Sequence, residues 1–428
     1  MSKTTKIEWR KLFLYQVYVR SHTTEGTFSA FNQDLDRIAA LGTDIVYFMP
    51  IHPIGKIKRK GGLGCPYSIQ DYRSVNPEYG TLEDFETTVR AIHDRNMKVM
   101  IDVVYNHTSH DSVLLQEHPE YFLHDENGNL ISKEPRWYDV QDFDYKSDKA
   151  LWDELIDTLL FWMKKGVDGF RFDVTSFLPL DFLLQARDKM MEFNPDVILL
   201  SESVHGHYCR HMRNRGFEIL SESEIYQAFD MAYDYDVHTY YEHYLQGKQT
   251  LNRYLREVLR QEEIYPQNYI KMRNLENHDF GRFAPMVDND PVKIDNWTAF
   301  VFFQKGSTMI YAGQEFSETL QPSLFDKEDV KWTGRDLSPL IRKLATLTKM
   351  DHFANGVFHL HLQDKDVIVG TYKYMGETIV GIFNVGNETG KVTVPLLDGT
   401  YEDLLSKNTI SVSDGNVILT KNPVIFVV

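Results

Sequence analysis

Two residues of opposite charge occupy alternate positions in one short apolar segment. In Gly169–Val174 (GFRFDV), Arg171 and Asp173 are separated by one residue, so in a strand both side chains point to the same face. A buried charge pair costs desolvation free energy that an apolar pair would avoid. We therefore expect a chemical role, in which Asp173 is a nucleophile and Arg171 keeps it ionised.

Other carboxylates and two histidines follow similar apolar segments. Asp102 and Glu202 lie at or near the ends of two such segments, and Asp279 follows a third. His107 and His278 come close behind. If these segments are strands of one parallel barrel, their carboxyl ends meet at a single mouth. Taken singly, Asp102 also fits a structural role in bonding loop amides, and each histidine fits an ordinary place at the mouth.

Clustered carboxylates beside imidazoles favour metal-assisted hydrolysis or glycoside cleavage. The sequence has no His-Glu-x-x-His motif, which a metal-dependent hydrolase of that type would need. Glycoside cleavage with retention needs two carboxyl groups about 5 to 5.5 Å apart, one a nucleophile and one an acid with a raised pKa. Adjacent strands lie about 5 Å apart, so Asp173 and Glu202 are suitably placed. Neighbouring Asp173 and Asp279 would make ionisation of Glu202 costly and so raise its pKa.

The elements that position these residues alternate between helix and strand from Phe13 to about Tyr311. The capping-box pair Thr81 and Asp84 predicts one helix start, and Gly166 predicts the end of a helix running from about Asp148 to Lys165. Short apolar segments lie between the helices. The predicted strands are Leu12–Val19, Ile45–Met49, Val99–Val104, Gly169–Val174, Val197–Glu202, a poorly marked strand near Phe229–Met231, Tyr269–Leu275 and Thr308–Tyr311.

This alternation predicts a (β/α)₈ TIM barrel, because continuous apolar strands between helices are typical of a covered parallel sheet. An open doubly wound sheet is the alternative, although no Gly-x-Gly-x-x-Gly turn follows an early strand. We expect a catalytic barrel over residues 1–350, with a short excursion after the third strand at 107–145. The β-rich residues 351–428 predict a separate C-terminal antiparallel domain, resembling a β-sandwich, in which the helices cease.

Composition limits the possible partners. The chain of 428 residues has a formal net charge of −16, which disfavours nucleic acid and anionic membrane surfaces, and it has no apolar run of the roughly 18 residues that span a bilayer. The first ten residues lack the apolar core of a signal peptide, so a cytoplasmic location is expected. Cys65 and Cys209 are expected to be free thiols.

Four short regions resemble the α-amylase family, glycoside hydrolase family 13. They occur in the family's order and are Asp102–His107, Gly169–Asp173, Leu200–Glu202 and Asn277–Asp279. Three supporting stretches also resemble it: Leu41–Ile51, Tyr67–Tyr72 and Tyr311–Glu315. The resemblance spans nearly the whole predicted barrel.

The resemblance implies a retaining hydrolase that cleaves α-1,4 links in maltodextrins through a covalent glycosyl-enzyme. It makes Asp173 the nucleophile, Glu202 the acid and then base, and Asp279 a ligand of two hydroxyls of the distorted sugar. It also implies that Arg171 holds Asp173 ionised, that His107 and His278 bond sugar hydroxyls, and that Tyr67 stacks beneath the ring. A transglycosylase or isomerase of the same family shares this chemistry, and a non-catalytic sugar-binding relative is a more distant alternative.

Two positions depart from the family's pattern. Ser176 and Phe177 stand where many members have a lysine and a histidine that touch the leaving-group sugars. His205, beyond Glu202, is expected to line that side and partly replace them. Trp137 could stack on a sugar or pack within the excursion. Chain length, linkage preference and oligomeric state are left open by the sequence.

The resemblance requires no cofactor for the chemistry, but some members bind a structural calcium. By that analogy Asn106 and Asp139 are candidate oxygen ligands. Few other oxygens are expected in so short an excursion.

Overall fold

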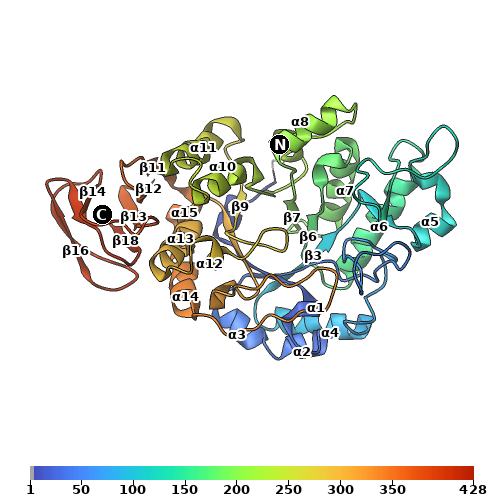
Figure 1. The fold of residues 1–428 in the computed structure, drawn as a ribbon, viewed down its shortest axis with the longest axis horizontal. Helices are drawn as coiled ribbons and strands as arrows, with labels where there is room; N and C mark the ends of the chain where they lie inside the picture. Colours follow the sequence, from blue (N-terminus) through green and yellow to red (C-terminus); the bar gives the residue numbers. More distant parts are fainter. Residues whose placement is uncertain (1–3) are drawn as a thin grey trace.

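The computed structural model describes residues 4–428. Eight parallel strands form a closed barrel in the order β1-β10-β9-β8-β7-β6-β3-β2, which confirms the predicted fold class (Figure 1). The barrel strands are β1 Phe13–Val17, β2 Ile45–Phe48, β3 Lys98–Val103, β6 Gly169–Phe172, β7 Ile198–Ser201, β8 Met231–Tyr233, β9 Lys271–Arg273 and β10 Ser307–Tyr311. The poorly marked sixth strand begins at Met231, two residues beyond the predicted start.

Helices and 3₁₀ turns connect the strands. The helices of the barrel portion are α1 Val19–His22, α2 Phe28–Asn32, α3 Leu35–Ala40, α4 Leu82–His93, α6 Ala150–Lys164, α7 Leu180–Phe193, α8 Gly206–Asn214, α9 Glu222–Ile225, α10 Tyr235–Leu245, α11 Leu251–Ile264, α12 Phe283–Met286, α13 Pro291–Phe303, α14 Ser338–Leu347 and α15 Asp351–Asn355. The 3₁₀ turns are η1 Ile7–Lys11, η3 Thr175–Phe177 and η4 Gln314–Phe316. Helix α15 lies where the helices were expected to cease. No helix of the described residues is long and apolar enough to cross a bilayer.

Local signals in the sequence set two of the helix ends. Thr81 accepts a hydrogen bond from the Asp84 N–H while the Asp84 carboxylate accepts one from the Thr81 N–H, which forms the predicted capping box of α4. Helix α6 ends before Gly166, whose φ of 93° is a conformation that favours glycine. The end of α6 at Gly166 limits where β6 can begin, and so where Arg171 falls in the barrel.

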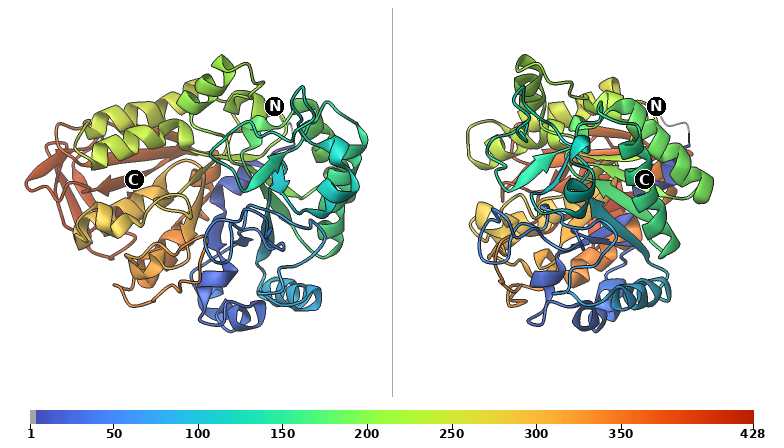
Figure 2. Two further views of the ribbon diagram at one scale, coloured as in Figure 1. Left: turned by 45° about the vertical axis from the view of Figure 1, so that its right-hand side comes forward. Right: turned by 90° about the vertical axis from the view of Figure 1, so that its right-hand side faces the viewer.

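The excursion after β3 is built on a small two-stranded sheet. Strand β4 (His107–Ser109) pairs antiparallel with β5 (Val140–Asp142), and His107 lies opposite Asp142 in that register. A short helix that the sequence did not suggest, α5 (Val113–Glu117), and the 3₁₀ turn η2 (Pro119–Tyr121) lie between the strands. The excursion and the C-terminal domain lie at opposite ends of the molecule in Figure 1 and in the left view of Figure 2.

Two four-stranded antiparallel sheets form the C-terminal domain. Their orders are β11-β12-β13-β18 and β14-β17-β16-β15. The strands are β11 Val357–His361, β12 Ile368–Tyr374, β13 Glu377–Phe383, β14 Lys391–Thr393, β15 Gly399–Glu402, β16 Thr409–Ser413, β17 Asn416–Ile418 and β18 Val424–Val427. Phe303 of α13 joins the barrel to the first sheet, because its ring lies against Tyr372 and Phe383 at centroid distances of 5.4 and 5.1 Å.

This contact depends on a missing side chain at Gly381. A Cβ there would lie 2.6 Å from the Phe383 ring and 2.9 Å from the Phe303 ring, both closer than van der Waals contact. We expect Gly381→Ala to lower the free energy of unfolding by about 1–3 kcal/mol, the usual cost of overpacking a core. Thermal unfolding checks this, with Gly206→Ala as the control because a Cβ at Gly206 meets nothing within 4 Å. Equal midpoints for the two variants would contradict the packing argument.

Candidate active site

The Arg171 guanidinium lies at the centre of the carboxylates. In the pairing of β3 with β6, Asp102 is directly opposite Arg171. The Arg171 Nη1 lies 2.8 Å from both Asp102 Oδ1 and Asp173 Oδ1, and Nη2 lies 2.8 Å from Glu202 Oε2. The side chains of Arg171 and Asp102 are fully buried. One guanidinium therefore compensates three carboxylates from three adjacent strands, which include the predicted nucleophile and acid.

The backbone after the nucleophile holds Glu202. The Val174 N–H donates to Glu202 Oε2 at 2.9 Å. Val174 has φ of 35° and ψ of 46°, a left-handed conformation that is unfavourable for a β-branched residue. Such strain persists only where surrounding contacts impose it, and it is common at functional sites. The turn thus fixes the Glu202 carboxylate beside Asp173.

The electrostatics of Asp173 differ from the expectation that Arg171 simply keeps it ionised. Burial and the neighbouring Glu202 charge raise the pKa of Asp173 well above its ordinary value, although Arg171 opposes them. Burial likewise raises the pKa of Asp102 to about 6. Because one cation serves three buried carboxyl groups, adding the last negative charge is costly. The Glu202 carboxylate next to Asp173 is therefore one cause of the raised pKa of Asp173.

Asp279 is the most solvent-exposed of the carboxylates at the site. It follows β9, and its side chain is 42% exposed, whereas those of Asp173 and Glu202 are 11% exposed. Asn277 Oδ1 accepts from the Asp279 N–H at 2.8 Å and so shapes this turn. A carboxylate that faces solvent beside two buried ones is placed to meet a bound molecule rather than to hold the fold.

A chain of hydrogen bonds connects His278 and Tyr67 to Asp102, one of the carboxylates around Arg171. The Tyr67 hydroxyl donates to Asp102 Oδ2 at 2.8 Å and accepts from His278 Nε2 at 2.6 Å. Gln16 Nε2 donates to His278 Nδ1 at 2.9 Å, and the Tyr47 hydroxyl also donates to Asp102. Burial, reinforced by the nearby Arg171 charge, lowers the pKa of His278 to about 3. His278 is therefore a neutral, oriented donor.

His107 is also neutral and oriented by a neighbour. Asn106 Nδ2 donates to its Nδ1 at 3.0 Å, which places the ring proton on Nε2. Burial, with the charges of Lys133 and Lys60, lowers the pKa of His107 to about 3. Trp137 covers the ring at a centroid distance of 5.5 Å and also lies 6.2 Å from Phe177, so it packs within the excursion next to the site.

Asn106 and Asp139 do not fit the calcium site that the resemblance suggested. Lys133 Nζ donates to Asn106 Oδ1 at 2.8 Å, and Lys60 Nζ lies 2.7 Å from Asp139 Oδ1. Each candidate oxygen already has an ammonium partner, and the two partners differ. Among residues 4–428, no group of three or more His, Cys, Asp or Glu side chains is arranged to hold a metal ion.

The far side of the site is more aromatic than polar. His205 precedes α8 and stacks on Tyr235 at 4.9 Å, and Phe280 lies edge-on to it at 6.3 Å. Burial lowers the pKa of His205, and the Glu202 charge partly offsets this. The ring thus lies near the acid and is half-buried.

Ser176 and Phe177 are both buried and serve packing. Ser176 Oγ accepts from the Val204 N–H at 3.1 Å, and Phe177 lies against Trp137 and Tyr208. Neither side chain offers the charged or imidazole group of the family's pattern at this position.

Several contributors were not singled out by the sequence. Gln16 could have been noticed as a polar residue within an apolar strand, whereas Tyr47, Tyr235 and Lys133 gave no such signal. Their roles become visible only when strands that are distant in sequence are brought together in the barrel.

The fold is a closed parallel barrel with carboxylates gathered at its mouth, and comparison with known sequences gives the family. The profile described as "Alpha amylase, catalytic domain" matches residues 14–140 and 135–352, and that described as "Bacterial Alpha amylase C-terminal domain" matches 359–426. The chain belongs to the α-amylase family.

The similar solved structures are described as alpha-amylases, whereas the similar curated sequence is named a maltosyltransferase. The chain is similar to an alpha-amylase from Lactobacillus plantarum, with 41% identity, a TM-score of 0.96, and 99% of this chain and 100% of that one covered. It is also similar to AmyB, a noncanonic maltogenic alpha-amylase from Thermotoga neapolitana, with 32% identity, a TM-score of 0.87, and coverage of 98% and 99%. An alpha-1,4-glucan:maltose-1-phosphate maltosyltransferase from Picrophilus torridus is 28% identical over 249 residues, which cover 52% of this chain and 39% of that protein. The match thus spans less than half the length of this curated relative.

The shared role of Arg171 leads to a test that needs no substrate. Arg171→Met would leave three buried carboxyl groups without their cation, and we expect it to lower the free energy of unfolding by about 3–5 kcal/mol near neutral pH. Burial raises the pKa values of Asp102 and Asp173, and Arg171 opposes that rise, so without Arg171 these two groups take up protons more readily on folding. The deficit should therefore shrink as the pH is lowered from about 8 to about 5.5.

Unfolding midpoints of parent and variant across that range measure the effect. Arg73→Met is the control, because Arg73 pairs with Glu154 and Asp157 at the surface and should cost about 1 kcal/mol or less. A deficit in Arg171→Met that stays constant or grows on acidification would contradict the shared-charge description.

Proposed function

We propose that this chain is a retaining α-glucoside hydrolase that cleaves α-1,4 links in maltodextrins. The observation that carries the proposal is the pair Asp173 and Glu202, bridged by one guanidinium, beside the exposed carboxylate of Asp279. Retaining cleavage needs a buried nucleophile and a nearby acid in such proximity. The family membership and the similarity to two proteins described as alpha-amylases support it.

In the first step, Asp173 attacks the anomeric carbon while the bond from that carbon to the bridging oxygen breaks. Glu202 gives its proton to the departing oxygen. In the second step, Glu202 takes a proton from water, whose oxygen attacks the anomeric carbon as the bond to Asp173 breaks. Two inversions at one carbon give net retention. The cycle starts with Asp173 ionised and with Glu202 carrying the proton that the departing oxygen receives.

The surrounding residues bind the sugar in this scheme. Asp279 accepts hydrogen bonds from two hydroxyls, and the neutral His107 and His278 act as hydroxyl ligands. Tyr67 offers a ring face, held in place by its bond to Asp102. Because the histidines are uncharged, they add no cation that would destabilise the positive charge developing on the sugar in the transition state. His205 with Tyr235 is proposed to line the leaving-group side.

Transfer to a sugar acceptor is the second candidate, because the curated relative from Picrophilus torridus is named a maltosyltransferase. A phosphorylated donor would require cations that are free to bind phosphate. Near the carboxylates, however, Arg171, Lys133 and Lys60 are bonded to protein oxygens. This favours a neutral glucan, while a sugar hydroxyl could still replace water in the second step, as in a transglycosylase or isomerase.

Removing either member of the pair should abolish hydrolysis. We expect Asp173→Ala and Glu202→Gln to lower kcat/KM on maltoheptaose by at least about 10³-fold, because each removes a group that acts on the reacting bonds. Glu218→Gln, at a carboxylate that is 84% exposed and pairs with Lys146, should leave the rate within about twofold of the parent. The assignment is refuted if either pair variant stays within about tenfold of the parent.

Product analysis separates hydrolysis from transfer. Maltotriose, maltoheptaose, pullulan and sucrose are each incubated with the enzyme, with and without added glucose or maltose, and maltose 1-phosphate is tested as a donor. We expect shorter maltooligosaccharides as the main products, with little change on adding acceptor. Products longer than the substrate as the main outcome, or consumption of maltose 1-phosphate, would favour the transferase.

The raised pKa of Asp173 predicts the pH dependence. The nucleophile must be ionised, and burial together with the Glu202 charge raises its pKa above 3.8, so ionisation is lost as the pH falls through that raised value. The acid limb of kcat/KM should therefore lie well above about pH 4. Rates at constant ionic strength measure it, and an acid limb at or below about pH 4 would contradict the electrostatic description.

A further inference from the structure

Lys133 is a partly buried cation at the junction of the barrel and the excursion. Its side chain is 13% exposed, and its Nζ lies 2.8 Å from Asn106 Oδ1 and 3.9 Å from Asp142 Oδ2. The ammonium also lies 5.7 Å from the centre of the Phe177 ring. An ammonium surrounded by an amide oxygen, a carboxylate and an aromatic face has the partners that a bound cation would take.

Asp142 depends on this cation. Its side chain is fully buried, and Oδ2 also accepts from the Lys133 backbone N–H at 2.9 Å, while Oδ1 accepts from Ser132 Oγ at 3.3 Å. Asp142 ends β5, opposite His107 at the start of β4. Removing the Lys133 charge would thus leave a buried carboxylate uncompensated at the base of the two-stranded sheet.

Lys133 also determines how Asn106 acts on His107. Because the ammonium can only donate, it binds the amide oxygen, and the Asn106 Nδ2 must then face His107 Nδ1. That bond keeps the ring proton on Nε2. Lys133 is therefore two hydrogen bonds away from a histidine of the candidate active site.

We propose that the Lys133 ammonium takes the place of a divalent cation at this junction, so that the excursion is organised and His107 is oriented without any metal. Asn106 and Asp142 are the oxygen ligands, and Lys133 is a positioning residue. The organisation of the excursion is independent of the reaction. Only the effect on His107 rests on the function proposed above.

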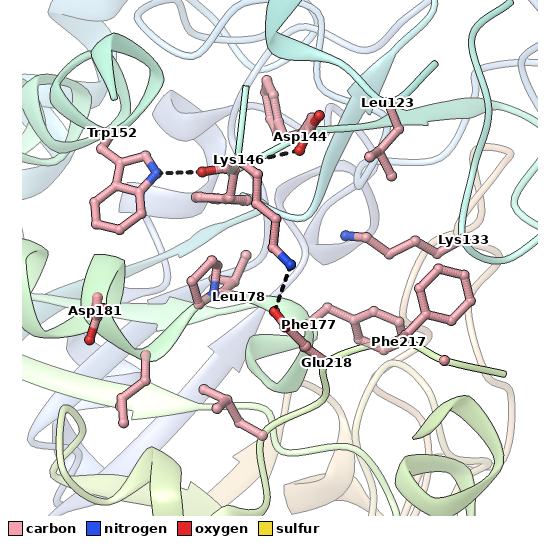
Figure 3. A pocket seen from close by; sticks show the side chains of 16 residues that line it. Leu123, Lys133, Asp144, Lys146, Trp152, Phe177, Leu178, Asp181, Phe217 and Glu218 are labelled. Atoms are coloured by element: carbon pink, nitrogen blue, oxygen red, sulfur yellow. Dashed lines mark hydrogen bonds and ion pairs between the residues drawn. The ribbon is translucent and has the colours of Figure 1, made fainter. Parts of the chain in front are cut away.

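Lys133 lies on the wall of a pocket next to the excursion. This pocket of about 610 Å³ is lined by none of the three catalytic carboxylates, and Figure 3 shows Lys133 there near Phe177 and Phe217. Solutes can therefore reach the space that a shortened side chain would leave. Lys146 lines the same pocket but pairs with Glu218 at the surface, with 77% of its side chain exposed, which makes it the matched control.

Thermal unfolding tests the structural part, with parent, Lys133→Met, Lys133→Ser and Lys146→Met each measured in chelator and in millimolar CaCl₂. The parent and Lys146→Met should show the same midpoint in both buffers. Lys133→Met should unfold roughly 3–5 °C lower in both. Lys133→Ser should also unfold lower in chelator and should recover part of the loss in CaCl₂, because the vacated space then offers oxygens to a cation.

A parent midpoint that falls in chelator and returns with CaCl₂ would overturn the proposal, and so would Lys133→Met unfolding at the parent temperature. Failure of Lys133→Ser to respond to CaCl₂ would also count against the site as a cation position. None of these outcomes depends on the substrate, so they are distinct from a failure of the proposed function.

A double-mutant cycle tests the positioning of His107. Lys133→Met and Asn106→Ala should each lower kcat/KM on maltoheptaose by about tenfold, mainly through KM, and the double variant should be no worse than either alone. Independent, multiplicative losses would show that Lys133 does not act through Asn106 and would overturn the positioning role.

Discussion

The Arg171 guanidinium lies among three buried carboxylates, and the architecture of the site follows from that arrangement. Burying one arginine with one aspartate would be close to neutral in free energy, but adding a second and a third carboxylate leaves an excess of negative charge in a dry interior. This excess negative charge is stable in the interior only if protons or hydrogen-bond donors compensate it. The Val174 N–H and the hydroxyls of Tyr47 and Tyr67 supply such donors.

The side chains around this charged cluster are uncharged. His278 and His107 are both held neutral by burial, and each has its tautomer fixed by an amide, that of Gln16 or Asn106. Charge therefore remains concentrated on the Asp173 and Glu202 pair and on the exposed Asp279. Such a distribution suits a reaction in which positive charge appears on a neutral sugar and fades again.

The barrel could be predicted from the sequence, and so could the gathering of carboxylates at its mouth, because both follow from short-range patterns. Apolar strands ending in carboxylates located Asp102, Asp173 and Glu202, and helix signals such as Gly166 located the strand starts. What the pattern could not give was the sharing of Arg171 among three partners, since this depends on the register of β3, β6 and β7. The role of Lys133 was hidden for the same reason: its partners Asn106 and Asp142 come from both ends of the excursion.

Covalent labelling tests most directly whether Asp173 is the residue that bonds to the sugar. The Glu202→Gln variant is incubated with α-maltosyl fluoride, whose leaving group needs no protonation, so that the first step proceeds and the second is slow. Intact mass and peptide mapping then locate any adduct. The account predicts one maltosyl unit per chain, attached to Asp173. An adduct on another residue, or turnover of the fluoride by Asp173→Ala at the rate of the parent, would contradict it.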